Sequence, residues 1–222
     1  MEQIKKKSPP ILGVIIAGGK SGRMQSNAPK CLLDFNGKSI LSHIIDRAKL
    51  QVDHLIINAN SDDHAFTDTG LTVIPDEISG QQGPLAGMHT AMVWAKENIS
   101  DDCLIACFAS DVPLVPLDYV EKLNDVRNAK DADIAFATSN EKDHPVFVLL
   151  PVSLYDDLHK TLTIENSRAI YKWLKKHKTV EVDFQNENGI DPFFNVNTPE
   201  DLKTLKNKIA LSAPKPKQNR KP

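Results

Sequence analysis

The residues between Gly13 and Lys30 combine glycines with basic side chains directly after an apolar run. The stretch is GVIIAGGKSGRMQSNAPK. Its apolar residues predict a buried strand, and its glycines let backbone N–H groups approach an anion closely. Arg23 and Lys30 supply the positive charge that phosphate groups need. This combination predicts a loop that binds the phosphates of a nucleotide.

Two standard phosphate-binding motifs fit only part of this stretch. A Walker A loop ending at residues 19–21 (Gly-Lys-Ser) would need glycine at position 14, which is Val14. A dinucleotide-binding fingerprint over residues 17–22 would have to open a helix at once. Instead Pro29 lies in the loop, and the next helical pattern begins near Ser39. The context excludes both motifs.

Three polar side chains come at or just after the ends of predicted strands. Asp111 follows a buried strand, where a carboxylate can coordinate Mg²⁺; the alternative is a turn or helix N-cap acid, because Pro113 and Pro116 follow. Asp76 can accept two hydrogen bonds from guanine, from N1–H and the 2-amino group, or it is simply a loop acid. Asn58 either contacts a base edge or ribose, or satisfies buried backbone groups.

Strand-length apolar runs alternate with helix-length segments along the chain. The expected strands are 12–17, 53–58, 71–75, 103–109, 133–138, 145–150, 179–184 and 193–196. The expected helices are 39–50, 87–98, 116–127, 152–160, 164–177 and 199–210. This order predicts an α/β fold, a single three-layer Rossmann-like domain with a mainly parallel sheet. In such a sheet, right-handed crossovers place ligands at the carboxyl ends of the strands.

The phosphate loop resembles the signature of nucleotidyltransferases with a Rossmann-like fold, which is a hydrophobic strand, Ala-Gly-Gly, Gly-Arg-Met and a later lysine. Four further landmarks follow in the order found in the molybdenum cofactor guanylyltransferases. They are Asn58-Ala59-Asn60, Gly83-Pro84-Leu85-Ala86-Gly87-Met88, Asp143-His144-Pro145 and Asn195-Val196-Asn197-Thr198-Pro199. Together these motifs cover roughly residues 12–202, and on them the chain is similar to that family.

The resemblance implies transfer of GMP from GTP to the phosphate of molybdopterin, with release of pyrophosphate and with Mg²⁺ as cofactor. It implies catalytic roles for Arg23, Lys30 and Asp111, and metal binding by Asp111. The residues expected to bind the nucleotide, partly through backbone amides, are Ile16, Ala17, Gly18, Gly19, Lys30, Asn58, Asp76 and Asp111. The candidate contacts of the substrates are Gly83, Leu85, Gly87, His144, Asn195 and Asn197.

Several of these landmark residues also have structural alternatives. His144 is a proton donor, a pterin contact or a residue that starts a strand. The glycine-containing loop before residue 88 is a close-approach loop, a turn into a helix, or both. Thr198 is expected to cap the helix that Pro199 opens, and Asn197 is a better candidate than Asn195 for a metal or substrate contact.

The lysine loop departs from the family pattern and leaves two other functions open. The family often has Met-Gly-Gly-x-Asp-Lys where this chain has the longer, proline-containing segment 24–30. Pro29-Lys30 resembles the corresponding loop of the sugar-phosphate nucleotidyltransferases. One alternative is therefore a sugar- or alcohol-phosphate nucleotidyltransferase. The other is a catalytically silent nucleotide-binding scaffold, against which the presence of Arg23, Lys30 and Asp111 argues. Preference for guanine over uridine, cytidine or thymidine separates the two enzymes.

The composition is that of an ordinary soluble globular protein. Of 222 residues, 41% are hydrophobic and 25% are charged, and no apolar run approaches the ~18 residues of a membrane span. We expect a flexible N-terminal segment (1–10), the nucleotidyltransferase domain (11–211) and a basic disordered tail (212–222). The net charge is −2, but both termini are basic, so residues 11–212 carry a formal −8. An acidic body argues against a nucleic-acid surface.

The cysteines and the absence of a secretory signal predict a cytoplasmic protein. Cys31, Cys103 and Cys107 lack the spacing of a metal site, and we expect them to be reduced thiols. The expected partners are GTP and molybdopterin, together with cofactor-delivery or acceptor proteins, and neither nucleic acid nor membrane. The expected oligomeric state is a monomer or weak homo-oligomer.

Overall fold

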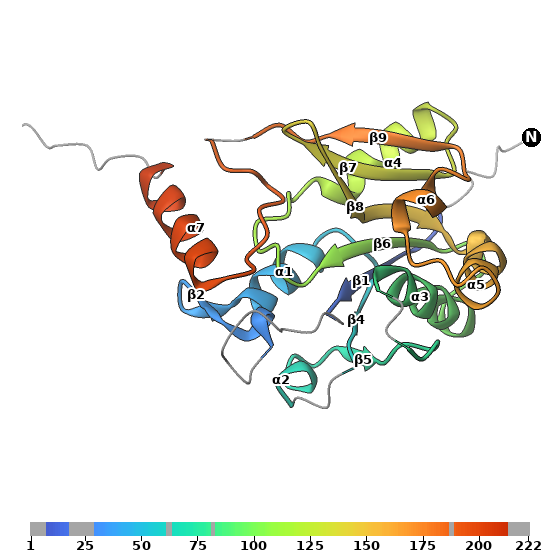
Figure 1. The fold of residues 1–222 in the computed structure, drawn as a ribbon, viewed down its shortest axis with the longest axis horizontal. Coiled ribbons are helices and arrows are strands. Elements are labelled where there is room, and N and C mark those ends of the chain that lie inside the picture. The colour runs from blue at the N-terminus through green and yellow to red at the C-terminus, as the bar shows by residue number, and fades with distance from the viewer. Residues whose placement is uncertain (1–7, 18–28, 61–63, 81–82, 187–188, 213–222) are drawn as a thin grey trace, which may run out of the picture.

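A central sheet with helices on both faces forms the core of the fold (Figure 1). The computed structural model describes residues 8–17, 29–60, 64–80, 83–186 and 189–212. Within these residues the main sheet has seven strands, in the order β5 (Thr72–Ile74), β4 (His54–Asn58), β1 (Ile11–Ile16), β6 (Leu104–Ala109), β8 (Lys142–Pro151), β7 (Ile134–Ser139) and β9 (Thr179–Asp183). The predicted α/β fold with a mainly parallel sheet is confirmed.

Strand β8 is the exception to the parallel order. β1 pairs in parallel with β4 and β6, β4 with β5, and β7 with β9. β8 lies between β6 and β7 and is antiparallel to both. Its reversal follows from the tight turn after β7, in which Asn140 and Glu141 have φ values of 51° and 60°. Positive φ at both central residues is the geometry of a type I′ hairpin turn.

The central strands are apolar on both faces because helices cover both faces. In β1, Leu12 and Val14 point to one face and Ile15 to the other, and all three are fully buried. The helices packed on the Leu12 face are α3 (Pro84–Asn98), α5 (Tyr155–Thr163) and α6 (Ile170–Leu174). Those on the Ile15 face are α1 (Ile40–Ala48), α4 (Tyr119–Ala129) and α7 (Pro199–Ser212). The two cores make the three predicted layers.

Two expected elements are wrong. Residues 193–196 form no strand, because Phe193 and Val196 point into the core at a spacing of three rather than two. The backbone hydrogen bonds of this segment, from Phe194 N to Asp191 O and from Val196 N to Asp111 O, do not form a ladder. The helix expected over 164–177 is only the short α6. Asn166 has φ 50°, which interrupts a right-handed helix before Ile170.

The structure also has short elements that the sequence patterns did not predict. They are the 3₁₀ turns η1 (Lys30–Leu32) and η2 (Val152–Leu154), the helix α2 (His64–Thr67), and a small hairpin of β2 (Asp34–Phe35) and β3 (Lys38–Ser39). Asn36 and Gly37 form the hairpin turn with φ values of 54° and 85°. An Asn-Gly pair is a strong sequence signal for such a turn.

Two expectations drawn from composition can be compared with the structure. All three cysteines lie in the described residues, where they are buried and none forms a disulfide. In the part of the chain that the structure describes, no helix has the length and apolar character needed to cross a membrane.

Candidate active site

The carboxyl ends of β4, β1 and β6 lie next to one another, as the sequence predicts. Asn58 at the end of β4 pairs in register with Ile16 of β1 on one side and with Ile74 of β5 on the other. Asp76 follows β5 by two residues, and Asp111 follows β6 by two residues. One edge of the sheet therefore carries the amide and both carboxylates.

The first cluster at this edge fixes the carboxylate of Asp76. Asn58 Nδ2 donates to Asp76 Oδ1 at 3.0 Å and to the Ile74 carbonyl at 3.2 Å. Asn60 Nδ2 donates to Asp76 Oδ2 at 2.7 Å, and the Asp76 amide donates to Asn60 Oδ1 at 2.7 Å. Two oriented amides hold the carboxylate, whose remaining lone pairs can still accept hydrogen bonds from a ligand. Asn58 itself is 1% exposed, so it satisfies buried groups and positions Asp76.

Helix α3 closes against this cluster through its glycines. A Cβ on Gly87 would lie 2.4 Å from Asn58 Oδ1, so only glycine lets the helix approach the amide this closely. Gly83 precedes Pro84 with φ 71° and ψ −161°, a conformation that is essentially confined to glycine. Leu85 is fully buried in the core, so its side chain is not a substrate contact. The predicted turn into a helix is confirmed, while binding of a ligand at this helix start stays a prediction.

The second cluster joins residues from distant parts of the chain around Asp111. Lys30 Nζ donates to Asn197 Oδ1 at 2.8 Å. Asn195 hydrogen-bonds the Asp111 carboxylate through its side chain. Burial raises the pKa of Asp111 above its usual value, while the charge of Lys30 and the hydrogen bond from Asn195 act in the opposite direction. A nearby cation stabilises the ionised form of such a half-buried carboxylate.

The segment that carries both asparagines is held at its two ends. Phe193 and Val196 are buried in the core, and Val196 N donates to the Asp111 carbonyl at 2.8 Å. At the start of α7, Asp201 N donates to Thr198 Oγ1 at 3.1 Å, and Asp201 Oδ2 accepts from the amides of Asn197 and Thr198. The predicted cap of Thr198 is confirmed, and it anchors Asn197 next to Lys30.

The expected phosphate loop is described only at its ends. Gly18, Gly19 and Arg23 lie outside the described residues. The amide of Ala17 donates to the Asn58 carbonyl at 2.8 Å, so it belongs to the sheet and is not available to a phosphate. Lys30 begins η1 and is half-buried at the second cluster.

His144 lies on the reversed strand β8, next to a bulge. Ala137 pairs with His144 and Phe136 pairs with Val148, so three residues of β8 fall between consecutive partners on β7. Pro145 is one of them and has no amide to donate to a ladder, which accounts for the bulge. His144 Nε2 lies 2.7 Å from Ser139 Oγ. Sequence reasoning missed Ser139, because nothing in its local pattern marks it.

The oxygen atoms around Asp111 suit a hard divalent cation. Among the described residues there is no group of three or more His, Cys, Asp or Glu side chains that could hold a metal by themselves. Mg²⁺ does not need one, because it is usually bound through one or two carboxylates, waters and the phosphates of a substrate. The Asp111 carboxylate, which accepts a hydrogen bond from the Asn195 side chain, therefore fits such an ion.

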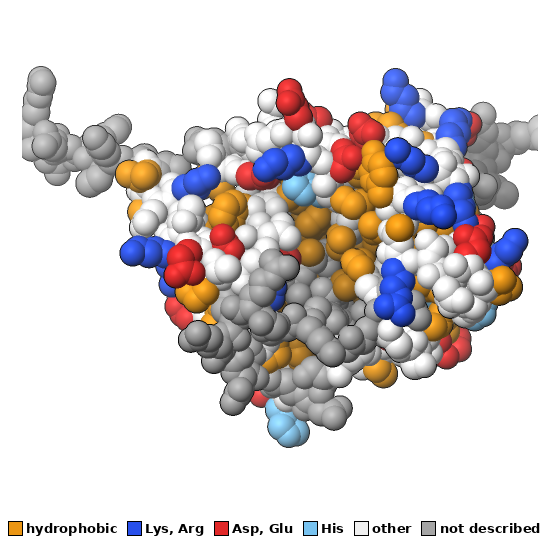
Figure 2. All heavy atoms as spheres, viewed as in Figure 1, with side chains coloured by type: hydrophobic (Ala, Val, Ile, Leu, Met, Phe, Trp, Pro, Cys, Tyr) orange, Lys and Arg blue, Asp and Glu red, His pale blue; other side chains and the backbone are white. Residues whose placement is uncertain are grey.

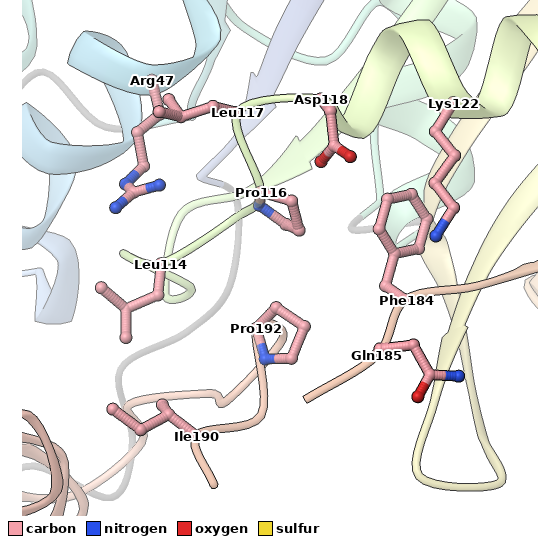
Figure 3. Close-up of a pocket in the computed structure, with 10 residues that line it drawn as sticks. All are labelled: Arg47, Leu114, Pro116, Leu117, Asp118, Lys122, Phe184, Gln185, Ile190 and Pro192. Atoms are coloured by element: carbon pink, nitrogen blue, oxygen red, sulfur yellow. The ribbon is translucent and has the colours of Figure 1, made fainter. Parts of the chain in front are cut away.

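The surface near the site is partly apolar. Figure 2 shows hydrophobic side chains gathered in the middle of the face over β6 and β8, with Lys and Arg side chains around its margin. A separate open cavity of about 670 Å³ lies between α1, the start of α4, residues 184–185 and residues 190–192. Figure 3 shows Arg47 and Lys122 on opposite sides of it. None of the candidate site residues that the structure describes lines this cavity.

Comparison with known proteins gives a consistent picture. The family model described as the MobA-like NTP transferase domain matches residues 13–180. A molybdenum cofactor guanylyltransferase of Mesorhizobium japonicum is 37% identical over 86% of this chain and 92% of its own length. One from Shewanella woodyi is 39% identical over 89% and 96%.

Solved structures support the fold. A molybdopterin-guanine dinucleotide biosynthesis protein A from Archaeoglobus fulgidus superposes with a TM-score of 0.67 at 19% identity, covering 90% of this chain and 99% of that one. A cytidylyltransferase from Leptospira borgpetersenii gives 0.63 at 18% identity, covering 92% and 87%. The family model and the close relatives span most of the chain, and the chain belongs to the family of MobA-like NTP transferases.

Proposed function

We propose that this protein is a molybdenum cofactor guanylyltransferase, which transfers GMP from GTP to the terminal phosphate of molybdopterin and releases pyrophosphate. The observation that carries the proposal is the meeting of two polar clusters at one sheet edge, around Asp76 and around Asp111. Relatives with that name, 36–39% identical over most of the chain, support the choice of substrates.

The Asp76 cluster is suited to recognise guanine. A carboxylate held by the amides of Asn58 and Asn60 accepts two parallel hydrogen bonds from guanine N1–H and the 2-amino group. Adenine, cytosine and uracil present no such pair of donors. Because both amides are already fixed by the protein, little reorganisation is needed when the base binds.

The Asp111 cluster is suited to phosphoryl chemistry. Lys30 contributes a positive charge toward the triphosphate, with Arg23 as a second expected contributor. Asp111 would hold Mg²⁺, with Asn195 and Asn197 beside it, and the ion would neutralise charge on the phosphate oxygens. Lys30 and Asn197 orient one another through their hydrogen bond, which keeps the ammonium at this edge.

The reaction needs alignment and charge neutralisation rather than a general base. A phosphate oxygen of molybdopterin, ionised at neutral pH, attacks the α-phosphorus of GTP. A new P–O bond forms as the bond to the β-phosphate oxygen breaks, and pyrophosphate leaves with the electron pair. The protein contributes by holding both substrates in line at the sheet edge.

Calorimetry with GTP, CTP, UTP and ATP, each with Mg²⁺, tests the proposal, followed by pyrophosphate release with molybdopterin. We expect selective GTP binding and turnover. Asp76→Asn should reduce the preference for guanine, while Asp101→Asn, a control at an exposed carboxylate, should not. Preference for CTP or UTP would favour a sugar- or alcohol-phosphate transferase, and GTP binding without turnover would favour a silent scaffold.

A further inference from the structure

A buried chain of hydrogen bonds leads from the β7–β8 hairpin to the segment before α7. His144 Nε2 lies 2.7 Å from Ser139 Oγ, and Ser139 Oγ lies 2.7 Å from Asp191 Oδ1. Ser139 is fully buried and His144 is half-buried. Fifty-two positions separate Ser139 from Asp191, so the fold brings them together. The proposed transfer reaction assigns no role to these hydrogen bonds.

The protons in this chain can be assigned from simple chemistry. Burial raises the pKa of Asp191, but hydrogen bonds from Ser139, the Phe193 amide and Asn140 outweigh burial and leave the pKa below its usual value. The carboxyl is therefore ionised at neutral pH. An ionised carboxylate only accepts, so the single hydroxyl proton of Ser139 is donated to Asp191. Ser139 Oγ then accepts from His144, whose Nε2 carries a hydrogen.

The other ring nitrogen of His144 is left as an acceptor. Burial, and to a smaller extent the charge of Lys142, lower the pKa of His144, whereas the charges of Asp191 and Asp143 raise it. The net result is a pKa below the usual value of histidine. The ring is therefore neutral at pH 7 or above. With the hydrogen on Nε2, Nδ1 has a lone pair, and it has no hydrogen-bond partner among the described residues.

Asp191 also fixes the ring on which His144 packs. Its Oδ1 accepts from the Phe193 amide at 3.0 Å, an Asx turn that sets the direction of this residue. The Phe193 ring lies 4.8 Å from the imidazole, centroid to centroid. Two residues further along, Asn195 reaches Asp111. One carboxylate thus orients the imidazole at both its nitrogen and its face, on the segment that leads to the reaction site.

We propose that Asp191 and Ser139 are positioning residues that hold His144 in its Nε2–H form, so that Nδ1 accepts a hydrogen bond from an N–H group of the second substrate. This rests on the proposed function, in which that substrate is a pterin rich in ring N–H and amino donors. The opposite tautomer would present an N–H to those donors and repel them. A hydrolytic Ser-His-Asp triad is a different arrangement, because here the serine is in the middle and fully buried.

The tautomer can be read directly, without substrate. Nitrogen-15 NMR of the seven histidines, with His144 assigned by loss of its signals in His144→Gln, should show a protonated Nε2 and a bare Nδ1. Ser139→Ala should move the populations toward a mixture. Ser153→Ala, at an exposed serine of η2, is the matched control and should leave them unchanged. A bare Nε2 in the wild-type protein would overturn the chain, as would no change in Ser139→Ala.

Kinetics test whether the acceptor meets the second substrate. Ser139→Ala should raise KM for molybdopterin by the inverse of the fraction of His144 that keeps Nε2–H, about twofold for an equal mixture of tautomers, and leave KM for GTP unchanged. In the His144→Gln background, Ser139→Ala should add nothing further, because Ser139 acts through His144. A parallel rise in both KM values, or full additivity of the two substitutions, would overturn the positioning role.

Failure of the proposed function is distinguishable from failure of this inference. If the wild-type protein binds GTP but never turns over molybdopterin, the transfer reaction and the contact with the pterin are both contradicted. The tautomer of His144 then still confirms or refutes the hydrogen-bond chain. If the protein turns over molybdopterin and the tautomer is the opposite one, only the inference fails.

Discussion

Replacing Gly87 with alanine tests how the two sides of the proposed nucleotide site fit together. The new Cβ would lie 2.4 Å from Asn58 Oδ1, 3.2 Å from Asn58 Cγ and 3.3 Å from Ile16 Cγ1. The shortest contact is about an ångström too close, so Asn58 has to move. It is tied through Nδ2 to Ile74 and Asp76, and moving it weakens the bonds that orient the Asp76 carboxylate.

The expected magnitudes follow from these contacts. Overpacking of this kind costs about 1–3 kcal/mol, and replacing a helical glycine with alanine returns about 1 kcal/mol. A net loss of about 1 kcal/mol lowers Tm by about 2–4 °C in a domain of this size. Loss of the orienting bond to a charged carboxylate weakens GTP binding by about tenfold.

Thermal unfolding and GTP calorimetry measure both effects, and the Asn58→Ala background provides the control. There the clash with the amide is removed, so Gly87→Ala should raise Tm slightly through helix propensity. Gly87→Ala with wild-type Tm and wild-type GTP affinity would refute the reasoning. So would an equal loss of stability in the Asn58→Ala background, because the contact with Asn58 could then not be its cause.

Three further outcomes are expected. Asp111→Asn should abolish Mg²⁺-dependent turnover and keep the Tm within a few degrees, whereas Asp118→Asn, at an exposed acid, should retain turnover; full activity of the first variant removes Asp111 from the metal site. Lys30→Ala should weaken GTP binding more than GMP binding, with exposed Lys130→Ala as control, and equal losses would contradict a role at the triphosphate. Burial, and then the neighbouring His159, lower the pKa of His89 to about 4. The unfolded chain therefore binds more protons between pH 4 and 6.5, so stability is present above pH 6.5 and falls by about 2 kcal/mol between pH 7 and pH 5. Urea unfolding should show this slope reduced in His89→Gln, and an unchanged slope would rule out His89 as its source.

The sequence predicts the part of the fold that depends on local periodicity. Apolar runs gave the parallel strands, and the rule that ligands meet the carboxyl ends brought Asn58, Asp76 and Asp111 to one edge. The order of the strands was harder to predict. The turn that reverses β8 contains Asn140-Glu141 rather than Asn-Gly, so the usual signal for it is weak. Asn36-Gly37 carries the usual signal and forms the turn between β2 and β3.

The sequence could not predict the long-range contacts of the site, and Ser139, which is defined by such a contact, was missed as a residue. Nothing in the local sequence distinguishes Ser139 from other strand residues, because its partner Asp191 lies 52 positions away. Lys30 and Asn197 are separated by 167 positions, and their hydrogen bond follows from the whole topology rather than from any local pattern. Asn60 belonged to a recognised motif, but its partnership with Asp76 depends on the spacing between β4 and β5.

The reversal of β8 divides the site edge into two parts of different origin. Parallel strands bring only their last residues to this edge, and each is followed by a connection that must lead back across the sheet. β8 brings its first residues, including His144, and reaches the edge through a two-residue turn at Asn140 and Glu141. Residues inserted at that turn would extend the protein surface beside His144 without altering β1, β4 or β5. The surface beside His144 can therefore diversify, in evolution or in the laboratory, while the strands of the proposed nucleotide site stay as they are.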